Sequence, residues 1–441
     1  MKRFKICLLS LMTVILSATV FSVAAGNTSI FSSEHDSQQV MVPIAISPED
    51  SLKVQQTRRV ILDDEPPVVG NDTVAVKNDM SGIQLYDSGL AVDERGADSL
   101  IKTPMIIRVA LVLSDIYGKK EMEFVKGFML GLSNIDMPSK SISLKVINGE
   151  MPTDSLMTTL SDFEPHAIFI TQDTDCPIDL LDYAGEHSTR IINVFEAKGE
   201  EYNSYPSIIQ ILTPSQTFNA SAAKYMTDTF SGANLILVGN PDPNDMLIKE
   251  ISGTWPSAKK ITMTPDEVET FRFNNDKRYV IYPCSSNPKE VKTVLDKVKL
   301  VMEENPDANI TIFGRPNWIV INNLGALASG LDLFFPSKFY FDASSNEGKK
   351  FISDFMSKYG LTPIKSHPVF SVMGYDMAHY FLPQLYRGQI DSDTSEWETQ
   401  ETLQLLMSLK SDNWYSGDYN RGSFIIHYSP DGKINKIPLL P

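Results

Sequence analysis

The stretch from residue 207 to residue 240 most constrains the fold, because it contains the end of one α/β layer and the start of another. A short apolar strand at 208–212 is broken by a polar turn at 213–215. A helix follows with Ala222, Ala223 and Met226 at helical spacing, and it stops at Gly232. Residues 235–238 are then continuously apolar, as in a strand buried on both faces. A second layer is therefore predicted to begin here.

The same order of elements occurs upstream. Residues 106–113 (IIRVALVL) form an apolar run with one arginine, and 114–120 form a polar loop. A helix with Met122, Val125, Met129 and Leu132 on one face then leads to a strand at 142–147. This order indicates a parallel sheet, whose binding loops lie at the carboxyl ends of its strands. The predicted fold is α/β, with two doubly wound parallel-sheet lobes that are joined by hinge crossovers and enclose a cleft.

The sequence predicts four parts. They are a signal peptide at 1–25, an acidic and mostly disordered spacer at 26–104, a first lobe made of 105–213 with 336–388, and a second lobe made of 214–335 with 389–441. The spacer has too little apolar surface to offset the entropy of ordering it. A partner-binding arm with short strands is the alternative. Residues 331–345 predict a strand pair, interrupted at Pro336, that crosses between the lobes.

The amino terminus indicates export. Basic residues precede an apolar stretch at 6–23, and Ala24 and Ala25 supply small residues for cleavage. We therefore expect a bacterial protein that is periplasmic or otherwise extracytoplasmic, through a cleavable signal peptide. The other interpretation is an uncleaved anchor, because the stretch approaches the roughly 20 residues that span a bilayer.

Charge and cysteine content restrict the partners and the redox chemistry. The formal net charge is −16, and such a surface repels phosphates, so nucleic acid is not an expected partner. Cys176 and Cys284 lie outside the leader, which is too few for a disulfide scaffold. One bridge and two thiols both remain open. Each cysteine follows the apolar strand of its own lobe, so we predict that the two lie on opposite rims of the cleft.

Two helices have clear ends. Residues 288–304 place apolar side chains on one face, with Asn287 positioned to cap the first turn. A helix around 351–359 is closed by Gly360, in the position that favours a left-handed residue.

Several motifs, in this order, resemble the type I periplasmic binding protein family, the branched-chain amino acid binding proteins and the related receptor ligand-binding domains. They are EFVKGFMLGL, ILTPSQTFNASAAKYM, FYFDASSNEGKKFISDFMSKYGLTP and GYDMAHYFLPQL, within about 105–385. The resemblance implies two doubly wound lobes joined by three hinge strands, with a ligand held between lobes that close around it.

The loops differ from the family pattern where amino acid binders hold the ligand carboxylate. They are TQDTDC and FEAKGEE here, and Asp173, Asp175 and Glu196 would repel a carboxylate. The stretch YPCSSNPKE lacks the family's acidic ammonium-binding residue. We therefore expect a neutral or cationic solute rather than a simple carboxylate.

The carboxyl ends of the apolar strands predict the residues that a ligand would touch. These are Asp115, Tyr117, Thr171, Gln172, Asp173, Thr174 and Glu196 from the first lobe, and Asn240, Asp242, Ser285, Ser286, Arg315 and Trp318 from the second. Arg315 is the main basic residue among them, and the rings of Tyr117 and Trp318 could stack on a ligand.

Catalytic motifs do not occur. The six histidines form no pair at metal-ligand spacing, and neither a phosphate loop nor a G-x-S-x-G elbow is present. We expect no enzyme activity, cofactor or metal. The predicted function is an exported, non-enzymatic solute-binding or ligand-sensing protein that presents a small molecule to a membrane transporter or receptor. The alternative is a scaffold or interaction protein that uses the same fold without a small ligand, for example in cell-envelope assembly.

Overall fold

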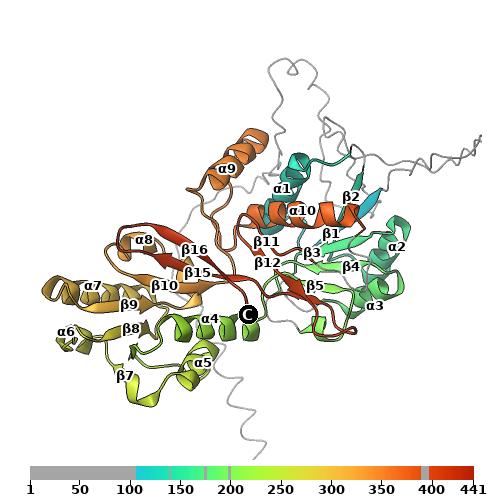
Figure 1. Cartoon of the computed structure of the whole chain (residues 1–441). Coiled ribbons are helices and arrows are strands. Elements are labelled where there is room, and N and C mark those ends of the chain that lie inside the picture. Colours follow the sequence, from blue (N-terminus) through green and yellow to red (C-terminus); the bar gives the residue numbers. More distant parts are fainter. Residues whose placement is uncertain (1–105, 139–140, 173–175, 197–199, 389–396) are drawn as a thin grey trace, which may run out of the picture. The chain divides into compact units, whose positions relative to one another are not determined.

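The computed structural model describes residues 106–138, 141–172, 176–196, 200–388 and 397–441 (Figure 1). The predicted signal peptide and spacer lie outside the described residues. The described residues belong to one unit and form two large sheets with helices packed on them. We call each sheet with its helices a lobe. A short ladder joins β11 (Gln400–Glu401) to β12 (Leu406–Met407).

In the described part of the chain, the first sheet has seven strands in the order β13-β14-β5-β4-β3-β1-β2. Its strands are β1 (Ile107–Leu113), β2 (Ile142–Asn148), β3 (Ala167–Ile170), β4 (Arg190–Asn193), β5 (Ile208–Gln210), β13 (Leu409–Lys410) and β14 (Asp418–Asn420). Every neighbouring pair is parallel except β13 with β14.

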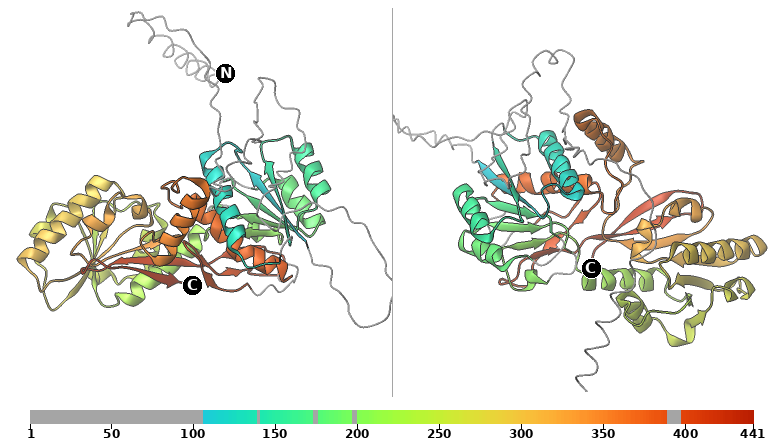
Figure 2. Two further views of the ribbon diagram at one scale, coloured as in Figure 1. Left: turned by 90° about the horizontal axis from the view of Figure 1, so that it is seen from above. Right: turned by 180° about the vertical axis from the view of Figure 1, so that it is seen from behind.

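Helices cover both faces of this sheet (Figure 2). Val109 and Leu111 of β1 belong to the core shared with α1 (Lys119–Asn134) and α10 (Phe370–Tyr386). Ala110 and Val112 belong to the core shared with α2 (Thr153–Phe163) and α3 (Ile178–Glu186). This alternation follows from the two-residue period of a strand. The helical elements of the first lobe are α1 (Lys119–Asn134), α2 (Thr153–Phe163), α3 (Ile178–Glu186), η2 (Glu201–Asn203), α9 (Asn346–Tyr359) and α10 (Phe370–Tyr386).

Two glycines allow α1 and α10 to pack closely. A Cβ atom at Gly127 would lie 1.7 Å from the Ser371 carbonyl oxygen, and one at Gly374 would lie 2.0 Å from the Phe124 carbonyl oxygen. No side chain fits at such distances, so the backbones meet only because both positions are glycine. The helix contact thus depends on two of the motifs that resemble the binding-protein family.

The second sheet has the order β16-β15-β10-β9-β8-β6-β7. Its strands are β6 (Asn234–Val238), β7 (Lys260–Met263), β8 (Arg278–Pro283), β9 (Asn309–Phe313), β10 (Leu333–Ser337), β15 (Ser423–Tyr428) and β16 (Ile434–Leu439). The pairs β10–β15 and β15–β16 are antiparallel, and the other pairs are parallel.

Helices again cover both faces, and two predicted helix ends are confirmed. Asn287 accepts a hydrogen bond from the Lys289 N–H at 2.9 Å and caps α7, while Gly360 ends α9 with a φ of 67°. The helical elements of the second lobe are α4 (Ser215–Thr229), α5 (Met246–Thr254), η3 (Ser257–Lys259), α6 (Glu267–Thr270), α7 (Pro288–Glu304), η4 (Pro316–Val320) and α8 (Leu324–Leu327).

Three crossings connect the lobes among the described residues. They are residues 211–214 after β5, 338–345 after β10 and 421–422 after β14. The Thr213 hydroxyl donates to the Gly422 carbonyl at 2.5 Å and joins the first crossing to the third. The two-lobe α/β fold predicted from the sequence is confirmed.

Two details of the prediction need correction. Pro336 does not interrupt a strand pair, because β10 runs through it and pairs with β15. Pairing of β10 with β9 ends at Phe334, so the missing N–H of Pro336 removes no bond on that side. In addition, β13 and β14 lie in the first sheet, although 389–441 was predicted to belong to the second lobe.

Candidate functional site

The predicted binding residues at the ends of β1 and β3 form hydrogen bonds within and between the loops that follow these strands. The Asp115 carboxylate accepts a hydrogen bond from the Tyr117 N–H at 2.9 Å, and the Tyr117 side chain is 77% exposed. Thr171 is fully buried, and its hydroxyl accepts a hydrogen bond from the Ser114 N–H at 3.1 Å. Gln172 is partly buried. Asp173 and Thr174, also predicted to bind, lie outside the described residues together with Asp175.

Glu196, at the end of the fourth strand region, is 3% exposed and acts electrostatically on Lys338. The Lys338 ammonium donates to the Ser215 hydroxyl at 3.3 Å and lies 5.6 Å from the centroid of the Phe218 ring. Burial lowers the pKa of Lys338 to about 8, although the Glu196 charge acts in the opposite direction. The sequence prediction missed Lys338, whose only signal is a single charge within the apolar run FFPSKFYF.

In the second lobe, the predicted polar residues mostly order loops. Asn240 and Asp242 are exposed, and Asp242 accepts a hydrogen bond from the Asn244 N–H at 2.9 Å. Ser285 accepts a hydrogen bond from the Asn287 N–H at 3.0 Å, and the Ser286 hydroxyl donates to Asn317 at 2.8 Å. These bonds fix the loops that follow β6 and β8.

Arg315 and Trp318, also predicted to contact a ligand, interact with other residues of the second lobe in this structure. Arg315 forms an ion pair with Asp245 and donates to the Cys284 carbonyl at 2.6 Å, so its charge is already neutralised within the lobe. Trp318 is 0% exposed, and its indole N–H donates to the Ser285 carbonyl at 3.3 Å. Trp318 therefore packs in the core, and stacking on a ligand would require it to move.

Cys176 and Cys284 are separate buried thiols, each in the core of its own lobe rather than on a rim. Burial raises the pKa of the Cys284 thiol to about 11. We expect iodoacetamide to modify the Cys284 thiol roughly 100-fold more slowly in the native protein than in the unfolded chain, because the thiolate is the reactive form. Peptide mass mapping after alkylation at pH 8, with and without denaturant, tests this because it distinguishes Cys284 from Cys176. Rapid labelling of Cys284 in the native protein would contradict the buried position.

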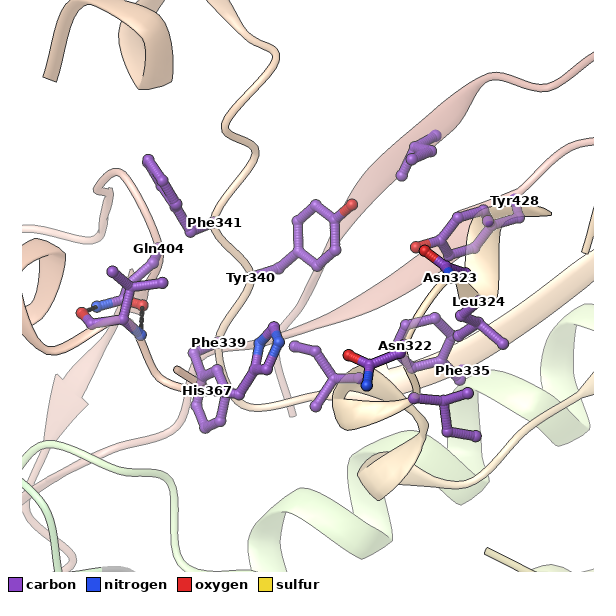
Figure 3. A pocket seen from close by; sticks show the side chains of 15 residues that line it. Asn322, Asn323, Leu324, Phe335, Phe339, Tyr340, Phe341, His367, Gln404 and Tyr428 are labelled. Carbon is purple, nitrogen blue, oxygen red and sulfur yellow. Dashed lines mark hydrogen bonds between the residues drawn. The ribbon is translucent and has the colours of Figure 1, made fainter. Parts of the chain in front are cut away.

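The structure also forms a cavity of about 400 Å³ beside the second crossing, which we call the crossing pocket (Figure 3). It shares no lining residue with the predicted binding residues. Its walls come from η4, α8, β10, the β15–β16 hairpin, the second crossing, the loop before α10 and Gln404. The lining residues are Ile319, Ile321, Asn322, Asn323, Leu324, Gly325, Phe335, Phe339, Tyr340, Phe341, His367, Val369, Gln404, Tyr428 and Ile434.

Backbone and side-chain hydrogen bonds hold the pocket wall formed by Tyr340 and Gln404. The Tyr340 N–H donates to the Gln404 carbonyl at 2.8 Å, and the Tyr340 and Tyr428 hydroxyls interact with each other. The Gln404 side chain accepts a hydrogen bond from the Val369 N–H at 3.1 Å and donates to the Val369 carbonyl at 2.9 Å. These hydrogen bonds connect the second crossing to the turn at Gln404 and to the loop before α10.

Asp376 of α10 binds the turn that carries Gln404. Its carboxylate accepts hydrogen bonds from the Thr402 hydroxyl at 2.7 Å and from the N–H groups of Leu403 and Gln404 at 3.0 and 2.9 Å. Burial raises the pKa of Asp376 to about 6, against the effect of these three bonds. Asp376 belongs to the GYD motif, so that motif holds the turn that carries Gln404.

The described residues contain no cluster of three or more His, Cys, Asp or Glu side chains suited to a metal ion. Within the same residues, none of the helices combines the length and the hydropathy that a membrane span requires. Nothing further follows from either absence.

The chain is similar to known proteins in its fold. No protein-family model matches the chain, and no curated protein sequence matches it. A putative branched-chain amino acid ABC transporter protein from Rhodospirillum rubrum is similar in structure, with 12% identity and a TM-score of 0.52 over 76% of this chain and 99% of that one.

The C-domain of LpoA from Haemophilus influenzae, described as a regulator of PBP1A, gives 15% identity and a TM-score of 0.47 over 75% of this chain and 99% of that domain. Full-length LpoA from the same organism gives 14% identity and a TM-score of 0.47, and the match spans 59% of its length. These neighbours are binding or regulatory proteins. With its two sheets and three crossings, this chain has the type I periplasmic binding protein-like fold.

Proposed function

We propose that the chain is an exported, non-enzymatic solute-binding protein and that its solute lies in the crossing pocket. The observation that carries this proposal is the pocket itself, whose volume of about 400 Å³ lies in the range typical of small-molecule sites. Most of its walls are apolar or aromatic, with a few polar groups, as in such sites. Export and delivery to a membrane transporter or envelope protein are part of the proposal.

The position of the pocket is suited to a protein whose ligand changes the relation between lobes. Tyr340 lies in the second crossing, Asn322 follows η4 of the second lobe, and His367 lies in the loop before α10 of the first lobe. A solute that contacts all three links both lobes through a crossing. Closure is favoured only by contacts that are stronger in the closed form, and residues of a crossing are placed to make such contacts.

An interaction protein without a small ligand is the second candidate, for example in cell-envelope assembly. It is favoured by the surface of the loop between β13 and β14, where the Trp414 side chain is 89% exposed and Tyr415 is 52% exposed. The two rings lie 5.5 Å apart, and Tyr415 is held by its N–H bond to Asn413 at 3.1 Å. Aromatic residues of this kind are enriched at protein interfaces. The internal use of Arg315 and Trp318 favours the same candidate.

Paired variants test where a solute binds. We expect Tyr340→Ala to reduce the amount of small molecule that copurifies with the exported protein by about tenfold, because it removes a ring and a hydroxyl from the pocket. The double variant Asp115→Ala with Asp242→Ala is the control and should retain the wild-type amount. Mass spectrometry of molecules released on denaturation measures both.

The opposite result also has a defined meaning. Loss of the solute in the Asp115→Ala, Asp242→Ala variant but not in Tyr340→Ala would place the site at the strand ends, as the sequence predicted. Thermal melting of each variant shows whether it remains folded. If wild type, Tyr340→Ala and the double variant all release nothing, the solute-binding function fails and the interaction function is favoured.

A further inference from the structure

The side chains that line the crossing pocket carry no formal charge at neutral pH. None of the described lining residues is an aspartate, glutamate, lysine or arginine. This contrasts with the chain as a whole, which has a formal net charge of −16. The pocket is thus an uncharged cavity in a strongly acidic protein.

The titratable lining residues remain uncharged as well. Burial lowers the pKa of His367 below the usual histidine value, which favours the neutral imidazole. Burial also raises the pKa values of Tyr340 and Tyr428, so both keep their hydroxyl protons. Neither an anionic nor a cationic side chain of the lining therefore faces a solute near neutral pH.

Charged groups close to the pocket already have partners. Asp342 accepts hydrogen bonds from the Ser344 N–H and hydroxyl at 2.8 and 2.6 Å. Lys436 forms an ion pair with Glu401 at 2.7 Å. A charged solute would have to compete with these existing interactions.

The lining offers ring surfaces and neutral hydrogen-bonding groups instead. Phenylalanine, tyrosine and histidine rings supply much of the wall, and Figure 3 shows His367, Tyr340 and Asn322 around the same space. The Asn322 amide can both donate and accept, and the Tyr340 and Tyr428 hydroxyls both keep their protons. The amide of Gln404 is used by Val369.

We infer that the crossing pocket takes an uncharged solute with a ring or other apolar face and with hydroxyl or carbonyl groups, and that it excludes free amino acids. This inference rests on the proposed solute-binding function. A free amino acid would bring a carboxylate and an ammonium into a cavity with no charged partner for either. The desolvation cost is several kcal/mol for each unpaired ion, whereas ring and hydroxyl groups find matching surfaces.

Identification of the bound molecule, together with two charged variants, tests the inference. The full exported chain is purified without added ligand, and mass spectrometry identifies what it releases on denaturation. We expect one uncharged compound. Asn322 is exposed in the structure, so a charge introduced there loses its water only where the solute covers it. Asn322→Asp and Asn322→Lys should each reduce the retention of a neutral solute by about tenfold for this reason. Asn322→Ser, which remains neutral and polar, should reduce it less than either.

The outcomes separate the inference from the proposed function. An amino acid or another charged molecule that is lost in Tyr340→Ala would overturn the inference and leave the solute-binding function intact. Opposite effects of the two charged variants, with one improving retention, would also overturn the inference. A molecule that Tyr340→Ala and both Asn322 variants retain at the wild-type level, or no released molecule in the wild type, would overturn the proposed function at this pocket as well.

Discussion

Replacing Trp318 with alanine is expected to lower the free energy of unfolding by about 3–5 kcal/mol, the usual cost of removing a large aromatic side chain from a core. Trp318 is 0% exposed and belongs to the core that also contains Val291 and Leu295 of α7. Its ring packs against Gly314, where a Cβ atom would lie 2.4 Å from the indole. Alanine would leave a cavity that the surrounding strands cannot fill.

Chemical denaturation of wild type and variant measures this loss. Trp414→Ala is the matched control, since Trp414 is 89% exposed and its replacement should change stability by no more than about 0.5 kcal/mol. If Trp318→Ala leaves the stability unchanged but abolishes solute binding, Trp318 is a stacking residue, as the sequence predicted. The expected result instead assigns Trp318 to the core.

Periodicity explains why many elements could be predicted from the sequence. The predicted helix at 288–304 has the bounds found in the structure, and the predicted strands at 142–147 and 235–238 each differ from the observed strand by one residue. In α7 the apolar side chains recur at helical spacing between a capping asparagine and Asn305, so both ends are encoded locally. The lobes follow because parallel strands with intervening helices have few alternatives.

Periodicity fails where an element depends on distant partners. In α1 the sequence placed Met122 and Val125 on the principal face, but the fully buried positions include Phe124, Gly127 and Phe128. The glycines decide this, because α10 approaches α1 closely at Gly127 and at Gly131. The short strands β13 and β14 are a similar case, because β14 pairs with the distant strand β5 and β13 pairs with β14. Strands of two or three residues carry little local sequence signal.

The candidate site shows the same limit. Sequence order locates the carboxyl ends of strands, but it does not reveal that Arg315 pairs with Asp245, a residue 70 positions away. The crossing pocket combines Asn322, Tyr340, His367, Gln404 and Tyr428, which come from separate elements. No local motif brings such residues together, so only the tertiary fold could identify them.

Lys338 is another residue whose role depends on this fold, because it is a partly buried cation in the second crossing. Burial lowers its pKa to about 8, whereas an unfolded lysine titrates near 10.4. Below pH 8 both states are protonated, and the full cost of the buried charge applies. Between about pH 8 and 10.5 the unfolded chain binds more protons than the folded protein, so this group makes stability rise with pH.

We therefore expect the stability of wild type, measured relative to Lys338→Met, to rise by about 2 kcal/mol between pH 7 and pH 10.5. A full shift from 10.4 to 8 corresponds to about 3 kcal/mol, and the partial exposure of Lys338 reduces this value. At any single pH, the difference in unfolding free energy between wild type and Lys338→Met also contains the lost bond to Ser215 and the effect on Glu196. The prediction therefore concerns only how this difference changes with pH.

Chemical denaturation at several pH values measures this change. Lys350→Met, which removes an exposed partner of Asp354, serves as the control without this slope. Parallel pH profiles for wild type and Lys338→Met would show that the Lys338 ammonium is solvated and that the second crossing does not bury a charge.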